Sequence, residues 1–193
     1  MKISRKQDLS FQKKLMAKCA IKGSNGQVPC SIYKIEEKDK DYFIHLIYKP
    51  GWKNYLYATI LDGDIRRGLA DDMFVLEDKN SNCLAFAEVS TMSREKNSLE
   101  FIEVKPVNRA KNDKRKKQYI GETLLNFISQ LTKKSGKEVL SVPHADPDAF
   151  VFYAKCFFNP TDKTHNFMIS GDDMDKLKEQ NFVHTGKEID FTG

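Results

Sequence analysis

Three apolar segments of strand length follow one another between residues 72 and 107 of this 193-residue chain, and they constrain the fold more than any other feature. The segments are DMFVLED, NCLAFAEVST and SLEFIEVKPV, and they are separated by KNSN and SREKN, which are both good turn sequences. Strands joined by such short connections pair side by side in opposite directions. The sequence therefore predicts an antiparallel meander of three strands.

A strand, helix, strand unit is predicted around and after the end of this meander. A lysine-rich stretch leads into a segment from about Tyr119 to Lys134 with apolar residues at helical spacing, and KEVLSV is then typical of a short buried strand. The segment DPDAFVFYAKCFF begins with Asp and Pro, which favour a helix start, and its aromatic residues recur at helical spacing. Further on, we expect a strand at HNFMIS, a helix over DDMDKLKEQN, and a last strand at FVHT or EIDF.

The N-terminal part is predicted from apolar spacing. Residues 5–20 carry apolar side chains near helical spacing, so residues 1–25 are expected to form a helical extension that ends near the turn GSNGQ. We expect a strand at CSIYKI, a helix over DKDYFIHLIYK, and further helix between residues 53 and 70. Residues 26–193 then form a single domain, because the chain has no repeat or long linker and 40% of its residues are hydrophobic.

The spacing of the cysteines and the distribution of charge limit the kinds of site and partner that the chain can have. Four cysteines without C-x-x-C spacing or clustered histidines argue against a zinc site and a disulfide framework, so we expect no metal. No apolar stretch could cross a bilayer and no signal sequence is evident, so we expect a cytoplasmic protein with no membrane partner. The net charge of +5 is concentrated between Lys105 and Gln118, which indicates a local anionic partner.

The stretch KNDKRKKQYIGETLLNFI changes from a run of cations into the start of an apolar helix. A helix N-terminus presents unpaired N–H groups and a partial positive charge. Cations placed just ahead of it make an anion site, so a phosphate-bearing ligand is the first candidate.

Two stretches resemble motifs of the GNAT family, the N-acetyltransferases that depend on acetyl-coenzyme A (acetyl-CoA). The family's coenzyme-binding pattern is matched at Val104, Pro106 and Arg109, and again at Gly121 in YIGETLL. The pattern A-x-x-F-Y-x-K-x-G-F is matched at five of its six named positions, which are Ala149, Phe152, Tyr153, Lys155 and Phe158. The resemblance covers roughly residues 72–160, and the predicted order of strands and helices agrees with it.

The resemblance implies both a fold and an activity. The fold is α/β or α+β, with a mixed, mostly antiparallel central sheet flanked by helices and a pair of central strands that splay apart. The activity is acyl transfer from acetyl-CoA to a primary amine, which could be a small molecule, a protein amine or an aminoacyl-tRNA. Two positions depart from the family patterns: Tyr119 stands where the first loop glycine is expected, and Phe157 replaces a later glycine. Either Arg109 or Lys116 fills the Q/R position of the loop, and Lys116 is favoured because it lies nearer the glycine.

The resemblance also assigns roles to residues. Coenzyme contacts are implied for one strand end, the basic loop, the helix start and a later loop position: Ile102, Val104, Arg109, Lys116, Lys117, Gln118, Ile120, Gly121, Glu122, Thr123 and Asp146. Tyr153 resembles the family's general acid, since a phenol with a pKa of about 10 stays protonated yet can serve a leaving thiolate. Glu100 is the expected general base, with a relay through His144 as the alternative.

Other interpretations stay open. Tyr153 could be an interior aromatic, and the aromatic residues between positions 35 and 70 could face the acceptor or belong to the core. The loop from Lys105 to Lys117 could instead contact nucleic-acid phosphates. Tyr119 and Phe157 could also mark a GNAT-shaped protein that has lost activity and binds a ligand or partner. The cysteines are expected in the core, with Cys156 reactive if exposed.

Overall fold

The computed structural model describes residues 13–36, 52, 72–109, 116–161 and 165–192. The strands are β1 (Lys14–Gly23), β2 (Gly26–Ile35), β3 (Asp72–Asp78), β4 (Cys83–Ser90), β5 (Lys96–Val104), β6 (Lys117–Gln118), β7 (Val139–Val142), β8 (Asn159–Pro160), β9 (Phe167–Ser170) and β10 (Asp190–Phe191). The helices are the 3-10 turns η2 (Pro106–Asn108) and η3 (Pro147–Ala149), and the α-helices α3 (Ile120–Lys134), α4 (Phe150–Lys155) and α5 (Gly171–Thr185).

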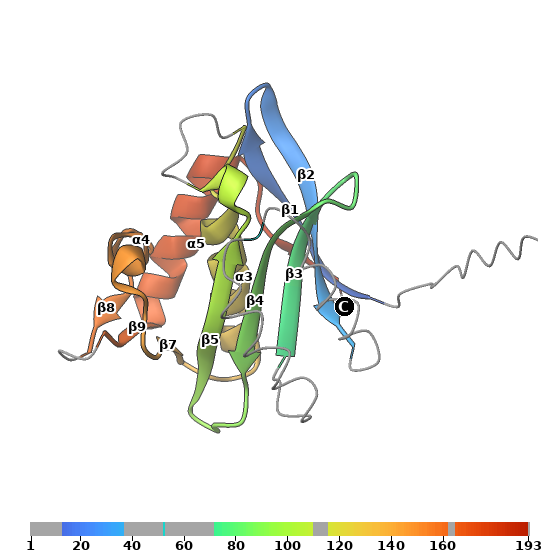
Figure 1. Ribbon diagram of the computed structural model, residues 1–193. Helices are drawn as coiled ribbons and strands as arrows, with labels where there is room; N and C mark the ends of the chain where they lie inside the picture. Colours follow the sequence, from blue (N-terminus) through green and yellow to red (C-terminus); the bar gives the residue numbers. More distant parts are fainter. Residues whose placement is uncertain (1–12, 37–51, 53–71, 110–115, 162–164, 193) are drawn as a thin grey trace, which may run out of the picture.

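These strands form one sheet in the order β10-β1-β2-β3-β4-β5-β7-β9-β8, with β6 beside β1 (Figure 1). All the pairs in the described part of the chain are antiparallel except that of β5 with β7. The predicted fold class, a mixed and mostly antiparallel sheet flanked by helices, is confirmed.

Most of the predicted elements from residue 72 onward are confirmed. Strands β3, β4 and β5 form the predicted meander, and the expected helices correspond to α3, α4 and α5. The last strand lies at EIDF, as β10. FVHT is not a strand, because α5 continues through it to Thr185, and Gly186, with a φ of 69°, forms the helix C-cap.

The prediction of a helix over residues 5–20, and with it of a helical extension over residues 1–25, is wrong where the structure describes them. Residues 14–23 form β1, which makes a hairpin with β2. The turn predicted at GSNGQ is present, but it joins two strands. Leu15, Met16 and Cys19 lie near helical spacing, which is why the sequence predicted a helix here. A bulge between Leu15 and Ala17 interrupts the alternation that would have revealed the strand. The helices expected over 39–49 and 53–70 lie outside the described residues.

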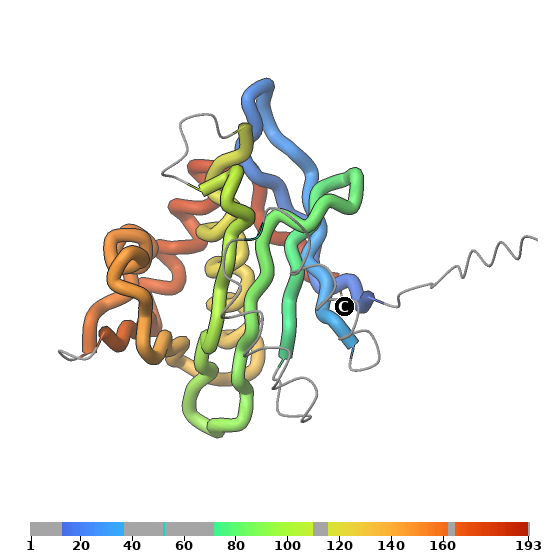
Figure 2. The backbone as a smooth tube through the Cα atoms, in the orientation of Figure 1, coloured from blue at the N-terminus to red at the C-terminus, as the bar shows by residue number. Residues whose placement is uncertain are grey.

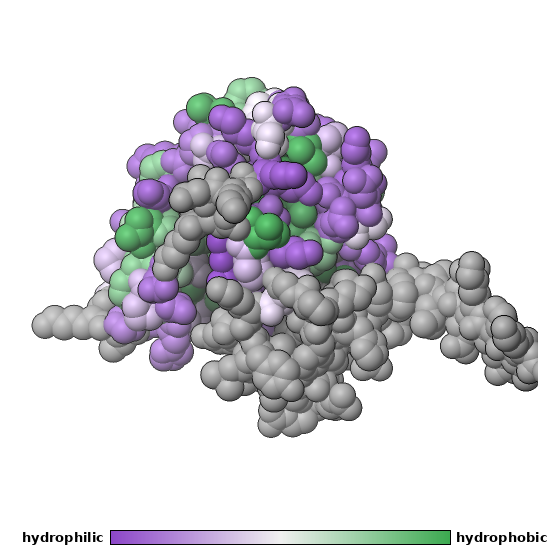
Figure 3. Space-filling view, turned by 45° about the horizontal axis from the view of Figure 1, so that its top comes forward, coloured by the Kyte–Doolittle hydropathy of each residue, from purple (hydrophilic) through white to green (hydrophobic). Residues whose placement is uncertain are grey.

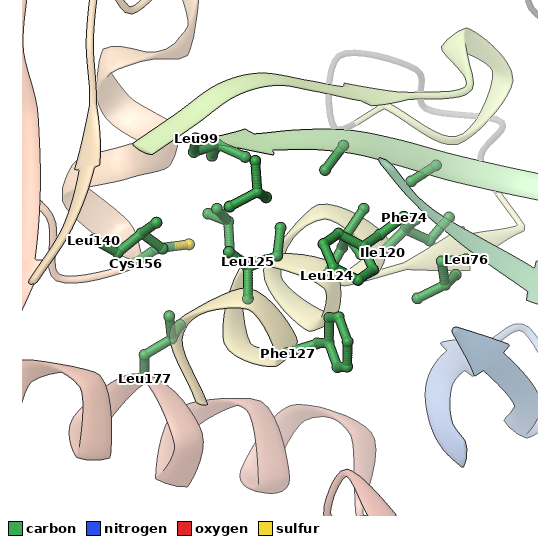
Figure 4. Packing of buried hydrophobic residues seen from close by; sticks show 14 of the residues in the cluster. Phe74, Leu76, Leu99, Ile120, Leu124, Leu125, Phe127, Leu140, Cys156 and Leu177 are labelled. Atoms are coloured by element: carbon green, nitrogen blue, oxygen red, sulfur yellow. The ribbon is translucent and has the colours of Figure 1, made fainter. Parts of the chain in front are cut away.

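The main core lies between one face of the sheet and the helices. Helix α3 contacts β1, β4, β5 and β7, and α5 packs against α3 on the same side (Figure 1). Figure 4 shows Leu124 and Phe127 of α3 close to the sheet side chains Phe74 and Leu76, all of them buried. Apolar burial of this kind is the main stabilising contribution to the fold.

A smaller apolar cluster lies apart from this core. Its buried members are Ile35, Met73, Val75, Cys83 and Phe86, and Trp52 and Phe101 pack against it. The ring of Trp52 lies 5.1 Å from that of Phe86 between centroids. Of the aromatic residues between 35 and 70 that were considered as acceptor contacts, the structure describes only this tryptophan, and it belongs to the cluster.

Strands β5 and β7 pair over a short stretch and then part. Only Lys96–Ser98 of β5 pairs with Val139–Ser141 of β7, whereas β5 runs on to Val104. From Leu99 onward, this edge of β5 has no strand partner within the described residues, and the predicted splay of two central strands is confirmed. On the opposite edge, a bulge next to β4 leaves Glu100 as the extra residue, between Leu99 and Phe101.

The surface face in Figure 3 is mainly hydrophilic, and its hydrophobic residues lie in separate places. Large exposed apolar side chains are scattered along the described chain, at Met92, Val107, Val151, Phe182 and Val183. Such single residues are normal on folded proteins. None of the described helices is both long and apolar enough to cross a membrane.

Candidate functional site

The N-terminus of α3 carries backbone donors that the helix itself does not use. No side chain caps it, and the first backbone bond of the helix runs from the Thr123 N–H to the Tyr119 carbonyl, at 2.9 Å. The N–H groups of Ile120, Gly121 and Glu122 therefore have no partner within the helix. Together with the partial positive charge of the helix end, they form an arrangement that suits a phosphate group.

Tyr119 adopts the left-handed backbone conformation just before this helix. Its φ is 61° and its ψ is 19°. Glycine reaches this region without steric cost, which is the physical reason for a glycine at this position of the family pattern. The Tyr119 ring is stacked on the ring of His184, with centroids 4.1 Å apart and an interplanar angle of 13°. The stacked ring thus belongs to a residue in a backbone conformation that tyrosine rarely adopts.

Gly121 is required for space rather than for its backbone angle. A Cβ atom at this position would lie 3.0 Å from Phe152 Cζ and 3.1 Å from Val104 Cγ2. The end of β5, the start of α3 and helix α4 thus meet at this glycine. The two glycine positions of the loop pattern differ physically: the first has a positive φ, whereas an added Cβ at the second would be crowded by neighbouring side chains.

The chain segment that leads into α3 is braced by the β1–β2 hairpin. Strand β6 pairs with β1 through Lys22 with Gln118 and Gly23 with Lys117. The hydroxyl of Ser24 donates to the Lys116 carbonyl at 3.4 Å. In Figure 2, this hairpin reaches the same end of the molecule as the chain entering α3. The N-terminal residues therefore support the candidate site, which the helical interpretation had missed.

Lys117 forms a buried ion pair that fixes β6 to β3. Its Nζ lies 2.6 Å from Oδ2 of Asp78, and the Asp78 side chain is only 3% exposed. Burial by itself raises the pKa of Asp78, but hydrogen bonds from Lys117, Asn82 and Asn80 outweigh it and lower that pKa to about 2. The Lys117 ammonium is thus directed at a carboxylate of the protein, whereas the sequence predicted a phosphate contact.

Arg109 fastens the turn after β5 in a similar way. Its Nε donates to the Val104 carbonyl at 3.0 Å, and its Nη2 lies 2.5 Å from Oε1 of the buried Glu103. Lys116, in contrast, is exposed and forms no ion pair within the described part of the chain. Lys116 is therefore better placed than Arg109 for the Q/R position of the loop. Residues 110–115, which hold most of the basic loop, lie outside the described residues.

The side chains of Glu122 and Thr123 face α5 rather than the helix start. The Glu122 carboxylate accepts from Gln180 Nε2 at 3.0 Å and from Asn181 Nδ2 at 3.2 Å, and it lies 2.9 Å from His184 Nδ1. The Thr123 hydroxyl accepts from Asn181 Nδ2 at 3.0 Å. These two side chains are thus engaged with α5. The coenzyme contact expected at the Glu122 backbone N–H and near Thr123 stays a prediction.

The other predicted coenzyme residues lie on β5 and at the start of η3. Ile102 and Val104 belong to the part of β5 beyond its separation from β7, and their side chains pack against the main core. Asp146 is exposed, and its carboxylate accepts from the Asp148 N–H at 2.9 Å, which caps η3. This cap is a local structural role, and a coenzyme contact of Asp146 stays a prediction.

The predicted acid and base lie in contrasting surroundings. The Tyr153 side chain is buried, at 5% exposure, with its ring 5.6 Å from that of Phe158 and 5.7 Å from that of Phe167. Glu100 is exposed at the bulge of β5. Tyr153 therefore packs as an interior aromatic, as the alternative interpretation expected, and its role as an acid stays a prediction. His144, the alternative relay, is exposed.

All four cysteines are free and buried. Burial, followed by the charge of Glu122, raises the pKa of the Cys156 thiol well above its usual range. The condition under which Cys156 would be reactive, an exposed thiol, is therefore not met. Within the ranges that the structure describes, no group of three or more His, Cys, Asp or Glu side chains could hold a metal ion.

Several residues around the site were missed by the sequence analysis. They are Ser24, Asp78, Gln180, Asn181 and His184. His184 lies 62 residues from Glu122 along the chain and belongs to neither matched motif. No local pattern could have indicated it, since the contact exists only after α5 has packed on α3.

Comparison with known proteins supports the fold through structure alone. No protein-family model and no curated protein matches the sequence. Among solved structures, a GNAT family acetyltransferase from Brucella melitensis in complex with acetyl-CoA is similar, with a TM-score of 0.51, 14% identity, and coverage of 73% of this chain and 87% of that one. A GNAT family N-acetyltransferase from Escherichia coli in complex with CoA has a TM-score of 0.54, 12% identity, and coverage of 76% and 84%. A spermidine/spermine N-acetyltransferase from Vibrio cholerae has a TM-score of 0.51, 14% identity, and coverage of 76% and 98%. The chain has the GNAT fold.

Proposed function

We propose that this chain, which has the GNAT fold, is an acyltransferase that moves an acetyl group from acetyl-CoA to a primary amine. The observation that carries the proposal is the position of two features side by side. Strand β5 leaves β7 after Ser98, and its far end at Val104 meets the uncapped start of α3 at Gly121. The free strand edge suits the amide-bearing arm of the coenzyme, and the helix start suits its pyrophosphate.

The backbone of this site supplies most of the proposed coenzyme contacts. Edge groups of β5 at Ile102 and Val104 would bind the pantetheine arm and polarise the acetyl carbonyl. The N–H groups of Gln118, Ile120, Gly121 and Glu122 would bind phosphate oxygens. Among the cations, we assign phosphate contact to Lys116 and a bracing role to Arg109 and Lys117, because those two already pair with buried carboxylates.

The proposed chemistry is direct transfer. A thioester supplies an activated acyl group: the amine nitrogen forms a bond to the carbonyl carbon, and the carbon–sulfur bond breaks. The Tyr153 hydroxyl would give its proton to the leaving sulfur, and Glu100, or water acting in its place, would take the proton from the amine. Positioning of the two reactants would supply much of the rate enhancement.

The acceptor is proposed only as a primary amine. One similar structure is a spermidine/spermine N-acetyltransferase, but at 14% identity it supports the fold and not the acceptor. A cytoplasmic location is part of the proposal, since four free cysteines suit a reducing compartment.

The alternative of an inactive scaffold rested on Tyr119 and Phe157. Their φ angles are 61° and 63°, so each residue adopts the conformation that a glycine would provide. Neither replacement therefore argues against a working coenzyme site.

Calorimetric titration with acetyl-CoA tests the proposed function. We expect saturable binding by the wild-type protein and about threefold to tenfold weaker binding by Lys116→Ala, because a charged contact to phosphate is lost. Lys96→Ala is the matched control, since Lys96 is also exposed but lies at the opposite end of β5. Absence of binding at millimolar acetyl-CoA would overturn the proposal.

Turnover tests the assignment of Tyr153. We expect Tyr153→Phe to lower kcat by about a hundredfold while the KM for acetyl-CoA changes little, because the ring packing is kept and only the hydroxyl is lost. Release of free thiol with a screened set of amines measures this. An unchanged kcat would restrict Tyr153 to its packing role.

A further inference from the structure

We infer that His184 is a positioning residue for coenzyme binding: it holds Tyr119 in the left-handed turn that precedes α3 and so keeps the phosphate-binding N–H groups preformed. The inference rests on the proposed function. It assigns a role to a residue of α5, which lies outside both matched motifs.

The geometry gives His184 two contacts with the start of α3. One face of its ring stacks on Tyr119, with centroids 4.1 Å apart and planes within 13° of parallel. Its Nδ1 lies 2.9 and 3.0 Å from the two carboxylate oxygens of Glu122. One contact is to the residue before the helix and the other is to its first turn.

The carboxylate that orients His184 is itself fixed. Glu122 is 7% exposed, and Gln180 and Asn181 also donate to it. A ring whose nitrogen is bonded to a buried, multiply bonded carboxylate has little freedom to rotate. His184 is therefore a rigid platform for the Tyr119 ring, although its own side chain is 31% exposed.

The platform matters because tyrosine disfavours this backbone region. Without the stack, Tyr119 would spend part of its time in other conformations, and the N–H groups that follow it would be misdirected. The apparent dissociation constant rises in inverse proportion to the fraction of molecules in the binding-competent conformation. His184 would thus raise affinity without touching the coenzyme.

A double-mutant cycle of His184→Ala and Tyr119→Gly tests the inference. In the wild-type background, we expect His184→Ala to raise the Kd for acetyl-CoA about fivefold, because the stack is lost. In the Tyr119→Gly background, the same change should leave the Kd within about twofold, since glycine adopts the turn without help. His184→Phe keeps a ring but loses the bond to Glu122, so it should restore part of the affinity in the wild-type background.

Kinetic and structural controls distinguish a positioning role of His184 from a general loss of folding or stability. The KM for acetyl-CoA should rise in His184→Ala while kcat stays within about twofold. Lys134→Ala is the matched control, because it removes another ring contact, 4.2 Å from the Phe191 ring, at the opposite end of α3. Its Kd should equal that of the wild-type protein. Circular dichroism spectra and thermal melting verify that each variant is folded.

The outcomes are distinguishable. If the wild-type protein binds acetyl-CoA and His184→Ala binds it equally well, the inference is overturned and the proposed function stands. If His184→Ala weakens binding as much in the Tyr119→Gly background as in the wild-type background, His184 acts by another route and the inference is also overturned. If the wild-type protein does not bind acetyl-CoA, the proposed function fails and the inference fails with it.

Discussion

Two turns of this protein place an aromatic residue where the backbone conformation favours glycine. Tyr119, with φ of 61°, precedes α3, and Phe157, with φ of 63°, follows α4. A Cβ atom in this region crowds the backbone at a cost of roughly 1–2 kcal/mol. Different contacts of the aromatic ring offset this cost at the two turns.

The Phe157 turn is held by the core, and the Tyr119 turn by a stack at the edge of the candidate site. The Phe157 ring packs against the main apolar cluster, and its N–H donates to the Ala154 carbonyl at 3.1 Å. The Tyr119 ring rests on the partly exposed His184. Core burial couples a strained turn to the stability of the whole fold, whereas a stack at a site couples it to that site. Changes at the Phe157 turn are therefore expected to alter the free energy of unfolding. Changes at the Tyr119 turn are expected to alter ligand binding.

The largest expected effect comes from removal of the ion pair between Lys117 and Asp78, which holds the chain ahead of Tyr119. Lys117→Ala should lower the free energy of unfolding by about 2–3 kcal/mol, because the buried Asp78 carboxylate loses its ionic partner. Urea denaturation at pH 7 measures this change. Lys116→Ala is the control and should stay within about 0.5 kcal/mol of wild type. Equal stability of the two variants would show that the ion pair does not brace the turn.

The same pair of variants has a defined pH dependence. In the folded protein, the pKa of Asp78 is lowered to about 2 from its ordinary value of 3.8. A lowered carboxyl pKa stabilises the fold at pH values above the ordinary one, and this contribution is lost as the pH falls through about 2. The stability difference between wild type and Lys117→Ala should therefore be largest at neutral pH and shrink on acidification. A difference that grows in acid would contradict this assignment.

Removal of the rings should separate the two turns directly. Phe157→Ala should lower the free energy of unfolding by about 2 kcal/mol, because a core contact is lost. Tyr119→Ala should lower it by less than about 1 kcal/mol, since only one partly exposed stack is lost. Thermal and urea unfolding measure both. Equal losses would mean that the two turns are held alike.

A comparison of alanine with glycine should give the same result at both turns. Glycine at either position should be more stable than alanine by about 0.5–1 kcal/mol, because it relieves the positive φ but gains entropy in the unfolded chain. Ser81, which has a φ of 57° in an exposed turn, is the reference position. Ser81→Gly should also raise the free energy of unfolding. If alanine matched glycine at one turn, the backbone there would not be left-handed in solution.

The smallest effect concerns Cys156, next to Phe157. Burial raises the pKa of this thiol and that of Cys19, so both should react slowly with a thiol reagent at pH 8. Phe157→Ala should speed labelling at Cys156 more than at Cys19, as judged by mass spectrometry of the peptides. Tyr119→Ala should not change this ratio. Uniform acceleration would indicate global rather than local opening.

The sequence predicted those elements whose signals are local. The apolar runs of β3, β4 and β5 are separated by polar turn residues, and the stripe of α3 repeats along one segment. The β1 prediction failed because apolar residues near helical spacing and a bulge obscured the alternation. In the candidate site, Gly121 was found by its place in a motif, but its reason, the close approach of Val104 and Phe152, depends on packing.

The sequence by itself determined the order of the elements from residue 72 onward and the junction of cations with the start of α3, because hydrophobic periodicity, turn residues and helix ends act over a few neighbouring residues. Only the tertiary structure decided that Lys117 pairs with Asp78, that Glu122 faces α5, and that His184 supports Tyr119. Each of these contacts joins segments far apart in the chain. Their energies depend on distance and burial in the folded protein, which no local pattern encodes.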